Sequence, residues 1–527
     1  MLKKIKKDIP VLMLLLVLYL FIALPRVAYF ELDHGDEFSD ADILLSGENF
    51  IKFGFLKTHF LPMYDVQLEK PGAFYTHFPA LSSVINGWLR FIVHTDSLMF
   101  FRAFAVGVSF LNIVAWYLFV RMLTGSLLAG FLAALFTFTN PINIFCMDSI
   151  HELAYSDFAR SVCMLLFLAI IKMTQAKSHQ RRLLFALLGL ALLFEAWVSF
   201  EYFFYLALFF LLFDIFFTTF RGRISLSVKI GLASCFVLGF CMHFGLVILH
   251  FNGIQGAIAD LHSAAVRRIA SSPDSPVPLT LASWFNLVLL RNFSLVLFFS
   301  AATLISLAVS GAALYFQLTR ASREIIKQLL RLALLLSICG ISWYVTFPAH
   351  SLAHTFVFFV SRHLIPVASV LFAAFCLLVL SFVEEKNPKS ILSRAVAMII
   401  IVMIALSGIF KSELPVLPES KARAADFQRM KSCLLALQKE SAALDEVALN
   451  YYRYPFIRYY LRRRCTVITR QEELSRRLAL PKYFIFMPYN TPASQALLEA
   501  LREKYELLFQ CSSGRFPAFF FKLKPTS

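Results

Sequence analysis

The chain has 527 residues, 59% of them hydrophobic, and its mean hydropathy is +0.70. This balance excludes an ordinary soluble protein, and the serial apolar runs indicate a polytopic membrane protein. The net charge is +17, from 50 basic and 33 acidic residues. Much of this excess lies in short segments between apolar runs, where basic residues set topology, so we expect no nucleic-acid partner. The remaining basic residues are available to bind anionic lipid headgroups or a phosphate group.

The first apolar run predicts an uncleaved membrane span. Four lysines lie within the first seven residues, and an apolar run follows to about Phe30. The run is roughly twenty residues long, enough to cross a bilayer. It lacks the small-residue end of a signal peptide. We therefore expect a span near residues 9–29, with a cytoplasmic N-terminus and an external segment after it.

Further apolar runs predict about eleven spans, and the basic residues between them mark the cytoplasmic ends. After the first, the expected spans cover residues 100–120, 127–142, 158–173, a tight hairpin within 183–219 that turns near 195–202, then 230–250, 287–316, 332–347, 364–383 and 395–410. An odd number of spans leaves the remainder of the chain outside. The expected location is multi-pass in a membrane, the inner membrane if the source is bacterial.

The last part of the chain has the composition of a soluble domain. Short apolar runs alternate there with helical patterns, among them an amphipathic helix at 493–505, which predicts a small α/β domain. The expected strands are at 447–451, 465–468, 483–488, 506–510 and 518–523. We therefore predict an all-α membrane domain, residues 1–410, and an external α/β domain, residues 411–527.

The nine cysteines divide by location. Cys433, Cys465 and Cys511 lie in the C-terminal domain, where at most one disulfide can form among them, and the sequence leaves open whether one does. Most of the others fall in apolar runs and are expected in the core. These are Cys163, Cys235, Cys241, Cys339 and Cys376.

The first external segment, residues 30–98, contains the adjacent acids Asp36 and Glu37 just past a span. Ionisable groups at a membrane face are costly to hold and are therefore a functional hypothesis. The alternative is two solvated acids in a loop. Ser39, followed by Asp42 and an apolar run, predicts a capped helix beside them. A second helix is expected at residues 80–93.

Other polar residues map to the same external face. In the segment 143–157 the best candidate acid is Asp148, with Glu152 as the alternative, while Glu195 and Glu201 are expected at the membrane interface. The external cations oppose the usual positive-inside bias, although contact with lipid headgroups would also explain each of them. They are Arg102, Arg267, Arg268, His350, His354, Arg362 and His363.

No metal site is predicted. His350 and His354 have helical i, i+4 spacing, and Arg362 follows eight residues later on the same expected face. The sequence has no His-Glu-x-x-His and no zinc-type cysteine spacing. A divalent metal is left open.

Several motifs together resemble the GT-C superfamily of integral-membrane glycosyltransferases. They are Asp36-Glu37 after the first span, the following helix with Gly47, and Tyr75-Thr76-His77-Phe78-Pro79 before the second span. Arg102 at the head of the second span and the acid in the second external segment extend the likeness. The pattern is most similar to the branch of protein O-mannosyltransferases and aminoarabinose transferases. It covers the N-terminal membrane region, and residues 411–527 carry no matching motif.

One feature departs from that branch. Aminoarabinose transferases have a Lys-Pro-Pro feature at the end of the first external segment. Here the nearest cation is either Lys70, in Glu69-Lys70-Pro71, or His77.

The resemblance implies a polyprenyl-phosphate-linked sugar as donor and inverting transfer outside the cytoplasm to a lipid, glycan or protein. It implies Asp36 as general base with Glu37 beside it, Asp148 as a second acid, and Arg102 and Arg362 as phosphate ligands. The other expected substrate and phosphate contacts are Lys70, Tyr75, His77, Arg267, His350, His354 and His363. The rival class is a transporter or lipid flippase. Transporters usually show repeats and broken helices, and no repeat is visible here.

Overall fold

The computed structural model describes most of the chain. The described residues are 2–28, 37–64, 66, 74–77, 79–173, 178–269, 280–286, 319–353, 358–386, 391–406, 409, 418–450, 454–477, 479–488, 491–511 and 517–525. The chain divides into two compact units. Unit 1 comprises Met1–Val27, His77–Pro79 and Arg102–Leu414, and unit 2 comprises Ala28–Thr76, Ala80–Phe101 and Pro415–Ser527.

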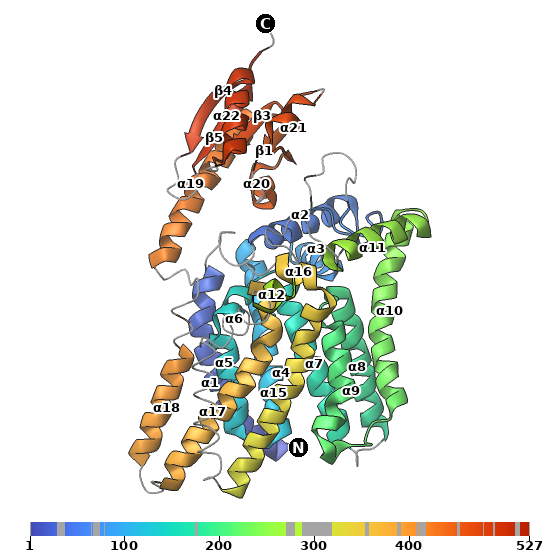
Figure 1. Cartoon of the computed structure of the whole chain (residues 1–527), viewed down its shortest axis with the longest axis vertical. Coiled ribbons are helices and arrows are strands. Elements are labelled where there is room, and N and C mark those ends of the chain that lie inside the picture. Colours follow the sequence, from blue (N-terminus) through green and yellow to red (C-terminus); the bar gives the residue numbers. More distant parts are fainter. Residues whose placement is uncertain are drawn as a thin grey trace. The chain divides into compact units, whose positions relative to one another are not determined.

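Unit 1 is a bundle of long apolar helices (Figure 1). Its main helices are α1 (Leu2–Ala28), α4 (Leu98–Thr124), α5 (Leu127–Thr139), α7 (Glu152–Lys172), α8 (Ser178–Val198), α9 (Tyr202–Phe216), α10 (Leu226–His250), α15 (Arg320–Thr346), α17 (Ile365–Lys386) and α18 (Ile391–Leu406). Shorter elements at the helix ends are α6 (Pro141–Cys146), η1 (Thr218–Phe220), α11 (Ile254–Ile269), α12 (Leu281–Ser283), α16 (Pro348–Ala353) and η3 (Phe358–Leu364).

Local chemistry explains several of the helix starts. The side chain of Ser126 accepts a hydrogen bond from the Ala129 amide at the start of α5. The side chain of Asn140 does the same for Ile142 at the start of α6, where Pro141 fits the first helical position. Such caps satisfy backbone donors that have no partner within the helix. These capping residues therefore determine where α5 and α6 begin.

The interior of the bundle is rich in phenylalanine. Helix α15 packs on α17 and α9, α7 and α10 pack on α8, and α17 packs on α5. Phe167 of α7 lies against Phe209, Phe210 and Phe213 of α9, with ring centroids 4.7 to 6.0 Å apart. Between membrane helices such rings gain van der Waals contact with one another, and their packing fixes the helix spacing.

The chain is an integral membrane protein. Six helices of the described part are long and apolar enough to cross a membrane. They cover Lys6–Ala28, Leu98–Thr124, Glu152–Lys172, Leu226–His250, Ser322–Thr346 and Ser361–Glu384. Every predicted span except 287–316, which lies outside the described residues, corresponds to a helix. The predicted hairpin is confirmed, because α8 and α9 are separated only by residues 199–201.

Two sequence expectations about unit 1 are wrong. Helix α7 begins at Glu152, so Asp157 lies within a helix and not in a loop. Cys241 is exposed, because α10 turns much of its surface away from the bundle. Cys163, Cys339 and Cys376 are buried as expected.

Unit 2 contains two helices from the first external segment. Helix α2 (Glu37–Phe53) packs on α3 (Leu81–Val93), which confirms the second expected helix. The expected cap at Ser39 is wrong, because α2 begins two residues earlier and Ser39 lies in its first turn. A Cβ at Gly47 would lie 2.0 Å from Oδ1 of Asn86, so only glycine permits this close approach.

The rest of unit 2 is the predicted α/β domain. Its sheet has the order β2-β1-β3-β5-β4, with β1 (Glu446–Leu449), β2 (Arg464–Val467), β3 (Tyr483–Phe486), β4 (Tyr505–Cys511) and β5 (Ala518–Leu523). The pairs β1–β2 and β1–β3 are parallel, and β5 is antiparallel to β3 and β4. The helices of this domain are α19 (Pro418–Glu440), α20 (Tyr454–Leu461), α21 (Gln471–Ser475) and α22 (Pro492–Lys504).

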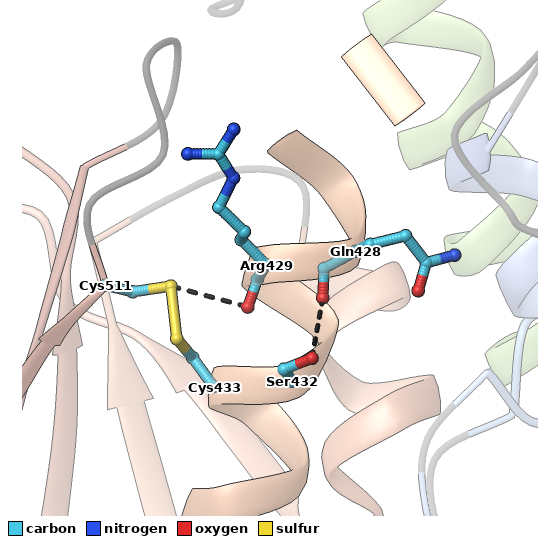
Figure 2. The surroundings of a disulfide bond; sticks show 5 residues. All are labelled: Gln428, Arg429, Ser432, Cys433 and Cys511. Carbon is cyan, nitrogen blue, oxygen red and sulfur yellow. Dashed lines mark hydrogen bonds between the residues drawn. A yellow bond between two sulfur atoms is a disulfide. The ribbon is translucent and has the colours of Figure 1, made fainter. Parts of the chain in front are cut away.

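A disulfide joins helix α19 to the end of strand β4. Cys433 and Cys511 are bonded across 78 residues of sequence, with a Cα–Cα distance of 6.3 Å. Figure 2 shows the bond beside the backbone of α19, where Ser432 donates a hydrogen bond to the Gln428 carbonyl. Cys465 is half-buried, and its Sγ lies 3.5 Å from the Arg463 carbonyl oxygen. The pairing left open by the sequence is therefore Cys433 with Cys511.

We predict that Cys433→Ser lowers the free energy of unfolding of the C-terminal domain by about 2–4 kcal/mol, since the disulfide closes a long loop. Cys465→Ser, the matched control, should change it by less than about 1 kcal/mol. Thermal unfolding of the full-length protein in detergent, with and without reductant, measures both. Equal effects of the two substitutions would contradict the assigned pairing.

Candidate active site

The first charged cluster of unit 1 joins three buried residues. Arg26 lies near the end of α1, Arg102 near the start of α4, and Asp148 between α6 and α7. Arg26 donates to Oδ1 of Asp148 from Nη2 and from Nε, the latter at 3.1 Å. Nε of Arg102 is 3.7 Å from Oδ2 of the same carboxylate. Both arginines are 0% exposed.

The surrounding helices hold this cluster in place. The hydroxyl of Ser109, about two turns along α4 from Arg102, donates to the Met147 carbonyl at 2.8 Å. Tyr19 donates to the Val106 carbonyl at 2.9 Å and so ties α1 to α4. Two guanidinium groups are therefore fixed around one carboxylate. Guanidinium groups present planar, forked donors that match the oxygens of a phosphate.

The second cluster is centred on Arg362 of η3. Its Nη2 donates to Oε2 of Glu201, and its Nη1 donates to the Ser156 hydroxyl at 3.0 Å and to the Leu153 carbonyl at 3.2 Å. Nε2 of His363 is 3.7 Å from the same Glu201 oxygen. Burial raises the pKa of Glu201, but the charge of Arg362 and the contact with His363 outweigh it and lower the pKa.

A tyrosine extends this cluster onto α7. Tyr202 donates a hydrogen bond to Asp157 and accepts one from Nη1 of Arg160 at 2.6 Å. Nη1 of Arg160 is 3.1 Å from Oδ1 of Asp157, and Nη1 of Arg362 is 4.0 Å from it. The cluster thus alternates acidic and basic groups from α7, the α8–α9 turn and η3.

A glycine permits η3 to approach the bundle. A Cβ at Gly340 of α15 would lie 2.9 Å from the carbonyl oxygen of His363 and 3.0 Å from Cδ2 of Leu364. Any side chain there would displace the Arg362–His363 segment from its acidic partners.

Glu195 and Glu201, expected at the interface, are instead fully buried. Within the described residues, neither carboxylate oxygen of Glu195 has a hydrogen-bond partner. Both acids lie at or beside the α8–α9 turn. In the sequence each is a single acid in an apolar run, which does not reveal its partners. The burial of Glu201 depends on Arg362, which comes from another element, η3.

The structure places the sequence-predicted site residues as follows. Asp148 and Arg102 lie in the first cluster, and Arg362 and His363 in the second, so the two expected phosphate ligands, Arg102 and Arg362, belong to different clusters. Asp36, Lys70 and His354 lie outside the described residues. Glu37, Arg267 and His350 lie in α2, α11 and α16, and their side chains are outside the described part.

Two aromatic residues of the first external segment also have defined places. In unit 2 the ring of Tyr75 stacks on Tyr64 with centroids 4.7 Å apart, and its amide donates to the Pro62 carbonyl at 2.8 Å. In unit 1, Nε2 of His77 is 2.7 Å from Oδ1 of Asp260 on α11. Glu152, the alternative to Asp148, pairs with His151.

Sequence reasoning missed Arg26, Asp157, Arg160 and Tyr202. The signal for Arg26 was present, because an arginine at the external end of an apolar run opposes the positive-inside bias. The other three carried no comparable signal, since one or two polar residues inside an apolar helix are equally consistent with several roles. Within the described part of the chain, no group of histidine, cysteine and acidic side chains could hold a metal ion.

Comparison with known proteins relates the fold to solved membrane glycosyltransferases. The chain is similar to ArnT, an aminoarabinose transferase from Cupriavidus metallidurans, solved with undecaprenyl phosphate bound, with a TM-score of 0.55 and 12% identity over 97% of this chain and 99% of that one. The apo state of ArnT gives a TM-score of 0.52 at 11% identity and the same coverage. An oligosaccharyltransferase from Archaeoglobus fulgidus gives a TM-score of 0.45 at 13% identity.

No protein-family model and no curated protein matches the chain. At these identities the comparison establishes the fold alone. The chain has the GT-C fold of ArnT along nearly its whole length. The fold expected from the motifs of the first external segment is confirmed.

We predict that Arg362→Ala destabilises the protein by about 3–5 kcal/mol, because it leaves the buried Glu201 carboxylate without its cation. Thermal unfolding in detergent measures the change. The double variant Arg362→Met with Glu201→Gln removes both charges and should recover most of the loss. Lys327→Ala, which breaks only an exposed pair with Glu324, should cost less than about 1 kcal/mol. Equal stability of wild type and Arg362→Ala would contradict the structural role of this pair.

Proposed function

We propose that the chain is a membrane glycosyltransferase that moves a sugar from a polyprenyl-phosphate-linked donor to an acceptor outside the cytoplasm. One observation carries this proposal: the fold follows ArnT, solved with undecaprenyl phosphate, over 97% of this chain and 99% of that one. The buried arginine cluster of unit 1 is chemically suited to the phosphate of such a donor. The acceptor class is a lipid, a glycan or a protein.

The reaction needs a site for negative charge. In a single displacement, the bond between the anomeric carbon and the phosphate oxygen breaks, and the lipid phosphate leaves with an additional negative charge. Donors fixed in advance around that charge stabilise the transition state. We assign this role to Arg102 and to Arg26, held by Asp148 in the first cluster. The second cluster contributes Arg362 and His363, with Arg362 also held by Glu201.

The reaction also needs a proton acceptor. We assign it to Asp36, which takes the proton of the acceptor hydroxyl as the hydroxyl oxygen bonds to the anomeric carbon. A carboxylate suits this role, and Asp36 immediately precedes the first residue of α2 in the chain. The N-terminus of a helix favours the ionised form of a nearby acid. Glu37, the neighbouring acid, has a smaller role in this proton transfer. The single displacement inverts the configuration at the anomeric carbon of the sugar.

Other residues are proposed as substrate contacts on chemical grounds. Tyr75, stacked on Tyr64, offers an aromatic face of the kind that packs against a sugar ring or a polyprenyl chain. His77, two residues further along the chain, is a hydrogen-bonding group. The remaining proposed contacts are Lys70, Arg267, His350 and His354.

The disulfide supports an external C-terminal domain. Disulfides persist in oxidising compartments and are rare in the cytoplasm. The Cys433–Cys511 bond therefore favours the orientation that the basic N-terminus and the span count predict. Transfer then takes place on the extracytoplasmic side of the membrane, the inner membrane if the source is bacterial.

We predict that Asp36→Asn lowers sugar transfer by roughly 10²–10⁴, the usual contribution of a general base. Binding of undecaprenyl phosphate should be retained, because the amide preserves size and polarity. Glu37→Gln should have a smaller effect, and Asp148→Asn an intermediate one. The measurement is formation of the glycosylated product when each variant is expressed in a deletion strain. Full product formation with Asp36→Asn would refute the assigned base, and loss of donor binding in all three variants would favour a transporter.

We also predict that Arg102→Ala weakens binding of undecaprenyl phosphate by about tenfold or more, since it removes one charge-assisted contact to the phosphate. Native mass spectrometry of the purified protein with added undecaprenyl phosphate measures the affinity. Arg121→Ala is the matched control on the same helix, because Arg121 pairs with Asp8 near the other end of α4. Equal weakening by both substitutions would count against a phosphate site at the first cluster.

A further inference from the structure

Two arginines of the C-terminal domain contact α2, the helix that follows the proposed base. Arg458 lies on α20, and Arg462 follows the last residue of that helix. Both belong to the same compact unit as α2. Since four residues make about one helical turn, the two guanidinium groups leave α20 on the same side.

Arg462 makes a forked contact with Glu48 of α2. Its Nη2 donates to Oε1 of Glu48 at 2.9 Å, and its Nη1 donates to Oε2. Nη2 of Arg90, from α3, is 3.6 Å from the same Oε1. Glu48 therefore receives cations from α3 and from the end of α20, two helices that pack on α2. A forked pair fixes orientation as well as distance.

The second contact is more deeply buried. Nη2 of Arg458 is 3.8 Å from Oδ1 of Asp42 on α2. Arg458 is 5% exposed and Asp42 is 7% exposed. Buried charges of this kind are costly unless they are paired. The two pairs together define what we call the α2 clamp: Arg458–Asp42 and Arg462–Glu48.

The backbone of Arg462 has a conformation that is unfavourable for a residue with a side chain. Its φ is +56°, in the left-handed region, where its amide caps α20 by donating to the Arg458 carbonyl at 2.9 Å. Glycine is the residue favoured at such a helix end. Arginine is strained there, and its side chain is the part that reaches Glu48. The guanidinium also stacks on the ring of Tyr459, 4.5 Å from its centroid.

Helix α2 can transmit this contact along its length. It is braced against α3 by the close approach at Gly47 and by Phe55, which follows α2 and stacks on Trp88 of α3 with centroids 5.5 Å apart. Its first residue is Glu37, the neighbour of Asp36. A helix held at both Asp42 and Glu48 has little freedom to tilt or slide, so the position of its N-terminal end is fixed.

We propose that Arg458 and Arg462 are positioning residues, through which the C-terminal domain holds α2 and thereby sets the place of the proposed base. This inference rests on the proposed function and gives the C-terminal domain a part in it. Misplacement of a reacting group by about 1 Å can cost roughly 10²-fold in rate. Loosening the clamp should therefore reduce turnover without removing a group that contacts the donor phosphate.

The test uses the full-length protein and Arg462→Gly. Glycine suits the left-handed backbone at this position, so the domain should fold as well as wild type, yet the contact with Glu48 is lost. We expect about tenfold faster hydrogen exchange of the α2 amides, unchanged protection of strands β3 and β5, and roughly 10²-fold less product in the deletion strain. Binding of undecaprenyl phosphate should stay within about twofold of wild type.

A charge exchange provides rescue. Arg462→Glu and Glu48→Arg should each release α2, and the double variant should recover part of its exchange protection and product formation, because the exchanged pair re-forms while Arg90 stays beside position 48. The matched control is Arg477→Glu, which breaks the pair with Glu446 inside the same domain. This control should leave α2 exchange and product formation near wild type.

Two results would overturn the inference and leave the proposed function standing. The first is a wild-type level of product formation in Arg462→Gly. The second is hydrogen exchange of the α2 amides that is as fast in Arg477→Glu as in Arg462→Gly. Failure of the proposed function has a different signature. The wild-type protein would then bind no undecaprenyl phosphate, while the exchange of α2 in Arg462→Gly would still report whether the clamp holds the helix.

Discussion

Buried pairs of arginine with a carboxylate determine how the helices of unit 1 meet. Arg26 of α1 reaches Asp148, 122 residues away, and Arg362 reaches Glu201, 161 residues away. A charge left alone in a membrane bundle is expensive, so each pair constrains two distant elements at once. The apolar packing of the phenylalanine-rich helices supplies most of the contact area, and the ion pairs select which helix ends come together.

The same constraint leads to the chemistry that we propose. A site that binds a lipid phosphate needs cations that are already fixed before the charge develops. In unit 1, the helices hold Arg26 and Arg102 around Asp148, so these guanidinium groups need little rearrangement. In unit 2, Asp42 and Glu48 of α2 are held by arginines of the C-terminal domain and α3. Each unit thus uses paired charges to keep polar groups in a defined place.

The periodicity of apolar residues predicted the helices and strands well, because it is a property of the local sequence. The hairpin turn was expected near 195–202 and occurs at 199–201, and the strand expected at 518–523 is β5. The charged clusters could not be predicted in the same way. The burial of Glu201 depends on Arg362, and the pairing of Asp42 depends on Arg458, which no local pattern reveals. The expected cap at Ser39 failed for a related reason, since Asp42 serves the α2 clamp and the helix begins at Glu37.

The most direct test of glycosyl transfer is the pool of polyprenyl-phosphate-linked sugar in lipid extracts of a deletion strain, measured by mass spectrometry. A transferase consumes this donor, so the account predicts that the donor accumulates in the deletion strain and that one glycosylated envelope component disappears. Re-expression of the wild-type protein should reverse both changes. A donor pool and a set of glycosylated components identical to those of the parent strain would contradict the account.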